Sequence, residues 1–190
     1  MSEPVIIVEY DPRWPILYEE EMARILSVIG HAIVQIEHIG STSVPGLGAK
    51  PIIDIAIALR HLADAAGCIA PLEGLGYQYV PEYEAELPER RYFRKGSPKR
   101  THHIHMVELT SEFWERHLLF RDYLRAHPDT AQAYDALKKE LAAKFGSNRD
   151  SYTDAKTEFV RLVEAKARAT PLSQRETRPP KRSGVGRERG

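Results

Sequence analysis

The sequence predicts an α+β fold in which a mixed or antiparallel sheet is flanked by helices and followed by a C-terminal part of about three helices. Short apolar runs of strand length all lie before residue 110. After residue 111 the apolar residues recur at helical spacing. We therefore expect an α/β part over 1–110, a helical part packed on it over 111–170, and a disordered basic tail over 171–190.

Composition sets limits on the class of protein. A chain of 190 residues that is 42% hydrophobic can bury one substantial core with a helical extension. The single cysteine, Cys68, excludes an internal disulfide framework and a multi-thiolate zinc site, and it fits a reducing compartment. We expect Cys68 itself to be a small buried apolar residue. The first ten residues do not have the pattern of a signal peptide, and the longest apolar run is too short to cross a membrane. These features predict a cytoplasmic protein without a membrane partner.

The neutral net charge conceals an uneven distribution. Residues 171–190 hold six Lys or Arg and two Glu, a net charge of +4, so residues 1–170 carry −4. An acidic core argues against a broad nucleic-acid-binding face. The alternative is that the tail acts as a weak electrostatic arm for RNA or DNA.

The first half of the chain reads as strands and helices in alternation. The β-branched run at 5–9 predicts a strand, and Asp11 with Pro12 predicts the cap and first residue of a helix that runs to about Ile29. Alternation predicts a strand at 33–39, which Gly40 ends.

The next apolar run, at 51–59, is almost continuous and β-branched, which is typical of a central strand covered on both faces. A helix over 61–74 and a strand at 77–80 follow. The arms 90–95 and 101–109, joined by the turn-rich GSPKR, predict a hairpin.

The second half predicts helices. Ser111 and Glu112 open the first, which ends near Ala126, and Pro128 starts a second that extends to Phe145. The sequence Gly-Ser-Asn at 146–148 separates it from a third, whose body is 152–169.

Residues 40–54 combine groups that suit a phosphorylated ligand. Gly40 lets the backbone come close to a phosphate, Ser41 and Thr42 add hydroxyl donors, and Lys50 can neutralise charge. Asp54 is costly to bury unpaired in an apolar strand, and holding Mg²⁺ is one way to compensate it. The alternative is a simple turn and cap, with Asp54 paired to Lys50 or to an arginine.

Several blocks resemble one known family. HIGSTSVPGLGAKPIIDI is similar to the signature of the GrpB family, which also resembles a domain fused to some dephospho-CoA kinases. RRYFRK, THHIHMVE, FRDYLR, HPDTAQAYDALKKELAAKF and SYTDAKTEF resemble its later blocks, so the likeness covers roughly residues 5–168. The resemblance implies a nucleotidyltransferase-like fold with a helical C-terminal part.

This sequence departs from the nucleotidyltransferase pattern in its acidic metal-binding residues. Such enzymes place two acids one residue apart on the strand after the turn, and a third on a neighbouring strand, to hold two magnesium ions. Here Asp54 matches the first acid, whereas Ala56 takes the place of the second. His103 and His105 face one side of the neighbouring strand, so they can complete a two-histidine, one-carboxylate metal site, bind a phosphate, or simply be bonded within the sheet.

Four further residues are candidates for the ligand pocket. Tyr152 and Lys156 share a helix face, Arg121 lies on an earlier helix, and Arg94 lies on a hairpin strand. Each cation can grip a phosphate or can be a solvated surface charge.

The sequence therefore predicts a protein that binds a nucleoside triphosphate or another phosphorylated small molecule with Mg²⁺ or Mn²⁺. Asp54, His103 and His105 are the expected catalytic and metal-binding residues if it transfers a nucleotidyl group or cleaves a phosphoanhydride. The alternative is a non-catalytic regulatory module with a CoA-like or adenine nucleotide ligand, which Ala56 favours.

Overall fold

The computed structural model describes residues 5–146 and 148–170, and the predicted basic tail lies outside them. The helices are α1 (Trp14–Ile29), α2 (Ile69–Gly74), α3 (Glu112–Ala126), α4 (Pro128–Phe145) and α5 (Arg149–Ala169). The strands are β1 (Gln35–Ile39), β2 (Ile53–Leu59), β3 (Tyr77–Tyr79), β4 (Arg91–Lys95) and β5 (His102–Glu108). Short 3₁₀ turns lie at Ser41–Ser43, Leu62–Cys68 and Pro81–Glu84.

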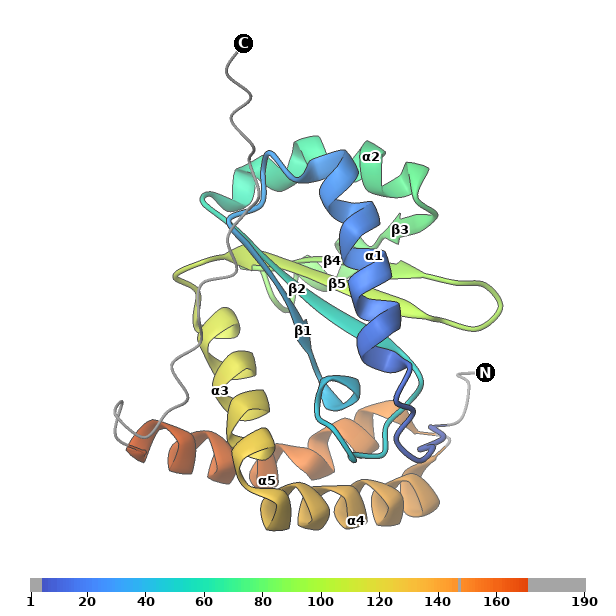
Figure 1. The fold of residues 1–190 in the computed structure, drawn as a ribbon, viewed down its shortest axis with the longest axis vertical. Helices are drawn as coiled ribbons and strands as arrows, with labels where there is room; N and C mark the ends of the chain where they lie inside the picture. The colour runs from blue at the N-terminus through green and yellow to red at the C-terminus, as the bar shows by residue number, and fades with distance from the viewer. Residues whose placement is uncertain (1–4, 147, 171–190) are drawn as a thin grey trace.

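The strands form one mixed sheet in the order β1-β2-β5-β4-β3. The central pair, β2 and β5, is parallel, and every other neighbouring pair in this sheet is antiparallel. In Figure 1, α2 lies above the sheet, whereas α3, α4 and α5 lie below it. The predicted mixed sheet flanked by helices, with three helices after it, is confirmed.

Strand β2 divides its side chains between the two faces of the sheet. Ile53, Ile55 and Ile57 belong to the main core with α1 and α2, and Ala56 and Ala58 pack with α3 on the other face. Both faces are covered, as the sequence predicted. Because side chains alternate along a strand, Asp54 lies on the α3 face.

The predicted strand at 5–9 is wrong. Val8 makes one isolated bridge to Ala49, and the amide of Val5 donates to the carbonyl of Gly146 at 2.7 Å. The β-branched run is therefore paired at single points with a loop and a helix end, and its Ile6 side chain is 60% exposed.

Two of the predicted helices also need correction, one in where it starts and the other in its type and length. Helix α1 begins at Trp14 rather than Pro12, because the Asp11 carboxylate accepts hydrogen bonds from the amide and guanidinium of Arg13 and holds a turn ahead of the helix. The helix predicted over 61–74 is a 3₁₀ segment followed by the short α2. The hairpin, the Ser111 cap of α3 and the bounds of α4 agree with prediction.

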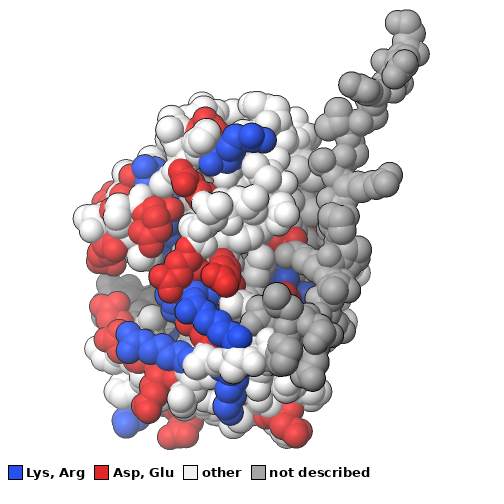
Figure 2. All heavy atoms as spheres, turned by 90° about the vertical axis from the view of Figure 1, so that its left-hand side faces the viewer, with Lys and Arg blue, Asp and Glu red and all other residues white. Residues whose placement is uncertain are grey.

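Surface charges are intermixed on the side shown in Figure 2, where acidic and basic side chains of the described residues alternate. Among the helices of the described residues, none has the length and apolarity to cross a bilayer. All five strands of the sheet precede residue 110 and α3 to α5 follow it. As domain boundaries, 1–110 and 111–170 stay predictions.

Candidate functional site

The turn after β1 approaches the carboxylate of Asp54 closely. Gly40 has φ +73° and ψ −177°, a conformation essentially confined to glycine. A Cβ at this position would lie 2.7 Å from Oδ2 of Asp54. Glycine is therefore required both by the backbone and by the distance to the carboxylate.

We expect Gly40→Ala to cost about 1–3 kcal/mol of unfolding free energy and to displace Asp54. Gly46→Ala is the matched control, because Gly46 also has a positive φ but its Cβ would meet open space. Denaturant unfolding of both variants measures the difference. An equal loss in the two variants would show that contact with Asp54 does not matter.

His38 anchors this turn from the end of β1. The Thr42 hydroxyl donates to the carbonyl of Ile52 at 3.2 Å, so Nε2 of His38 donates to that hydroxyl at 3.0 Å. The ring stacks on Tyr18 with centroids 4.7 Å apart, and burial lowers the pKa of His38 to about 3. The neutral imidazole thus fixes the turn, and Thr42 uses its hydroxyl hydrogen inside the protein.

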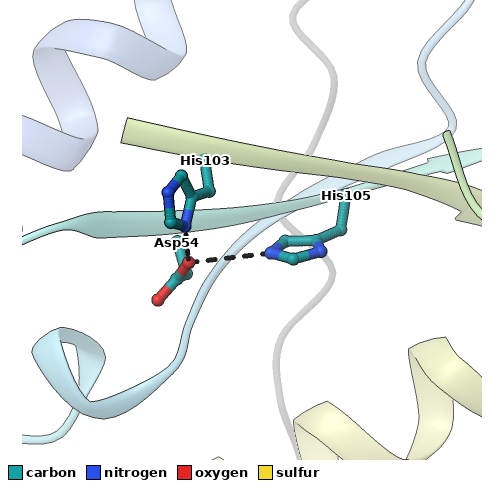
Figure 3. A group of neighbouring side chains, drawn as sticks. All are labelled: Asp54, His103 and His105. Atoms are coloured by element: carbon teal, nitrogen blue, oxygen red, sulfur yellow. Dashed lines mark hydrogen bonds and ion pairs between the residues drawn. The ribbon is translucent and has the colours of Figure 1, made fainter. Parts of the chain in front are cut away.

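Asp54 on β2 meets two imidazoles from β5, as Figure 3 shows. Its Oδ1 lies 3.0 Å from Nδ1 of His103 and 3.6 Å from Nε2 of His105. Burial opposes ionisation, but the two histidines outweigh it and hold the pKa of Asp54 well below its usual range. The Asp54 carboxylate is therefore ionised, and because its side chain is 30% exposed it is also accessible.

The parallel register explains how two imidazoles of β5 reach Asp54. Asp54 pairs with His103, and Ala56 pairs with His105. Ala56 has a small side chain, and the Nε2 atom of the His105 ring beside it lies 3.6 Å from Oδ1 of Asp54. Burial lowers the pKa of His105 and thereby favours the neutral ring.

Beside Asp54 lies a pocket of about 210 Å³ whose lining includes three lysines: Lys50, Lys138 and Lys156. Lys138 is 2% exposed, and its ammonium donates to Oγ of Ser41 at 3.1 Å and to the carbonyl of Gly48. Burial lowers the pKa of Lys138 to about 7.

The other two lysines of the pocket lie on one aromatic ring. The ammonium groups of Lys50 and Lys156 are 5.1 and 4.3 Å from the centroid of Tyr152. Burial, with a smaller contribution from Lys50, lowers the pKa of Lys156 to about 8. The pocket therefore concentrates positive charge in poorly hydrated surroundings.

The structure brings most of the predicted site residues together. Those that line the pocket are Ser41, Thr42, Lys50, Asp54, His103, Tyr152 and Lys156. Gly40 and His105 contact Asp54 from outside this lining.

Two predicted ligand-binding residues do not reach the pocket. Arg94 donates to Gln78 at 2.8 Å on the neighbouring strand. Arg121 is buried and donates to Glu37 and to the carbonyl of His38, both at 2.9 Å. Both guanidinium groups thus have partners within the protein.

Lys138 lines the pocket but was not among the predicted site residues, although a pattern in the sequence points to it. Buried residues of α4 recur at Ala131, Tyr134, Lys138 and Leu141, a helical apolar stripe in which one member is a lysine. A lysine in such a stripe needs a polar destination inside the protein.

The mixed sheet, with a glycine turn facing a strand carboxylate, places the chain in the nucleotidyltransferase-like fold class. A structure of Cid1 in complex with the UTP analogue UMPNPP superposes with a TM-score of 0.52 over 78% of this chain and 48% of Cid1. At 12% identity this likeness shows the fold alone.

The family model for GrpB protein matches residues 4–166, and the chain belongs to the GrpB family. A crystal structure of conserved protein GrpB from Enterococcus faecalis is 40% identical, with a TM-score of 0.77 over 85% of this chain and 96% of that one. The predicted family resemblance is confirmed.

Several curated proteins are similar over part of their length. The UPF0157 protein YqkA of Bacillus subtilis is 43% identical over 86% of this chain and 47% of YqkA, so the chain spans about half of that relative. A UPF0157 protein of Pseudomonas aeruginosa is 41% identical over 88% of this chain and 69% of the relative. A dephospho-CoA kinase of Mycolicibacterium paratuberculosis is 30% identical over 83% of this chain and 44% of the kinase.

Proposed function

We propose that the protein binds a nucleoside triphosphate together with one divalent cation. The observation that carries this proposal is the nearly complete burial of the Lys138 ammonium in a pocket that two further lysines also line. Lys138 has uncharged oxygens as hydrogen-bond partners, and Lys156 lies on an aromatic ring. A phosphate chain would supply the negative charge that favours their protonated forms.

The carboxylate of Asp54 is suited to hold the cation. It is accessible, ionised and next to the phosphate pocket, which is where an ion bridging protein and phosphate oxygens is needed. Mg²⁺ accepts one carboxylate with phosphate and water oxygens, and Mn²⁺ also accepts imidazole nitrogen. Asp54 would hold either ion, which would neutralise phosphate charge.

In its catalytic form, this site transfers a nucleotidyl group or cleaves a phosphoanhydride. One carboxylate does not hold two ions, so His103 takes over part of the work of the missing acids as a proton acceptor, and His105 takes over part of it as a charge stabiliser. His103 lines the pocket and lies against Asp54, which supports a role for it beside a phosphate bound there.

A thermal-shift series tests ligand binding. We expect ATP, CTP, GTP or UTP to raise the unfolding temperature in the presence of Mg²⁺ or Mn²⁺, because a ligand that binds only the folded state stabilises it. Asp54→Asn keeps the shape of the side chain and should abolish the metal-dependent part of the shift. A shift that survives this substitution unchanged would refute the metal role of Asp54.

A non-catalytic module for a CoA-like or adenine nucleotide is the second candidate. Ala56 in place of an acid favours it, as does the similarity to part of a dephospho-CoA kinase. CoA and dephospho-CoA therefore belong in the same series. Product analysis with labelled triphosphate separates the candidates, since the module would bind its ligand and leave it intact.

A further inference from the structure

We propose that Arg90 sets the tautomer of His105 and thereby makes His105 a donor that positions the Asp54 carboxylate rather than a metal ligand. The proposal rests on the proposed function in one respect, namely that Asp54 is the residue that holds the cation. Arg90 does not line the pocket, and the proposal gives it a role in positioning Asp54.

Arg90 lies immediately before β4, with its guanidinium packed against aromatic rings. Its Cζ is 5.1 Å from the ring centroid of Tyr92 and 6.0 Å from that of Phe113. Its NH1 lies 3.4 Å from Nδ1 of His105. The aromatic contacts hold the guanidinium in place beside the imidazole.

The chemistry of the two groups decides the direction of this hydrogen bond. A guanidinium has only donors, so Nδ1 of His105 is the acceptor and carries no hydrogen. In a neutral imidazole the hydrogen must then be on Nε2, which is the atom that faces Oδ1 of Asp54 at 3.6 Å. An Nε2 that carries hydrogen has no lone pair for a metal.

In a metal-binding histidine, the hydrogen bond at the second ring nitrogen normally has the opposite direction. Its second nitrogen donates to a carboxylate, a carbonyl or a water. Here the second nitrogen of His105 meets a cation that can only donate. The predicted two-histidine, one-carboxylate ligand set would therefore force two hydrogens toward each other at Arg90.

The same geometry gives the two oxygens of Asp54 different tasks. Oδ1 faces ring nitrogens of both His103 and His105, whereas Oδ2 lies toward the Gly40 turn. Fixing Oδ1 from two sides leaves Oδ2 as the oxygen for the cation. An oxygen site of this kind suits Mg²⁺ better than a metal that requires imidazoles.

Nitrogen NMR of the histidine rings in the ligand-free protein tests the tautomer directly. We expect His105 to show a protonated Nε2 and an unprotonated Nδ1 in the wild type and in Arg90→Lys, which keeps a donor. Arg90→Met should give a mixture of tautomers. The control Arg91→Met removes the neighbouring arginine, which pairs with Glu84, and should change nothing at His105.

Cobalt titration gives a second readout that needs no nucleotide. His105→Ala should leave Co²⁺ affinity within about twofold of the wild type, whereas a lost histidine ligand would cost tenfold or more. In Arg90→Met, Co²⁺ should bind about tenfold more tightly, and only while His105 is present. A protonated Nδ1 in the wild type, or a tenfold loss in His105→Ala, would overturn the proposal without touching nucleotide binding.

Discussion

Replacing Lys138 with methionine is expected to weaken binding of a magnesium–triphosphate complex by roughly 10- to 150-fold. This range corresponds to about 1.5–3 kcal/mol, the usual value of a hydrogen bond to a charged group. Methionine keeps most of the volume of the lysine stem but removes the ammonium that faces Ser41 and Gly48. Titration calorimetry of both proteins measures the loss.

The unfolding free energy of the ligand-free protein should change much less. Burying the Lys138 ammonium is costly, as its lowered pKa shows, and methionine removes that cost while leaving the carbonyl of Gly48 without its donor. The two effects oppose each other. A residue that lowers the stability of the free protein but raises its affinity for the ligand is typical of a binding site.

Lys139→Met is the matched control for this substitution. Lys139 is the next residue of α4, but its ammonium pairs with Glu9 at 2.7 Å and with Asp135 at 2.9 Å on the surface. Removing it should leave triphosphate affinity within about twofold, since surface ion pairs contribute little. Equal losses in both variants, or none in Lys138→Met, would contradict a phosphate site at Lys138.

The parts of the fold that the sequence predicted have strong local patterns. The apolar run at 51–59, the hairpin arms and the Ser111 cap each specify their structure through nearby residues. The run at 5–9 has an equally suitable composition for a strand, but it bridges only to the loop at Ala49. Strand formation depends on a partner that lies far away in sequence, which composition does not reveal.

The sequence indicated the contacts around Asp54 where a residue type was out of place, but it did not indicate contacts that depend on long-range geometry. Asp54 is conspicuous in an apolar strand, and alternation correctly put His103 and His105 on one side. The ion pair of Arg121 with Glu37 could not be predicted, because Glu37 lies far away in sequence, on β1. The acceptor at Nδ1 of His105 likewise depends on the position of Arg90, which no spacing rule gives.

Triphosphate affinity is expected to fall as pH rises through 7 to 9. The pKa of Lys138 is about 7 and that of Lys156 about 8, so both lose their protons in this range in the free protein. Each lysine that must be protonated for binding weakens it by up to about tenfold per pH unit, until the higher pKa of the complex is reached. A terminal phosphate is already ionised above about pH 6, so the ligand does not cause this trend.

Proton uptake separates this explanation from a general effect of alkaline pH. Calorimetry at pH 8 in buffers of different ionisation enthalpy should show uptake of up to about 1.4 protons per ligand bound, and about 0.5 fewer in Lys156→Met, because Lys156 is only about half deprotonated at this pH. Binding without proton uptake, or affinity unchanged from pH 7 to 9, would contradict the assignment of both lysines to the phosphate.

The ligand-free protein should show the opposite dependence on pH. An unfolded lysine titrates near pH 10.4, well above the pKa of about 7 for folded Lys138, so the unfolded chain binds more protons between these values. The contribution of Lys138 to the free energy of unfolding therefore rises with pH in that window, while the stabilisation by the ligand declines. The free energies of unfolding measured with and without triphosphate should therefore approach each other as pH rises. Lys138→Met should weaken both pH trends together.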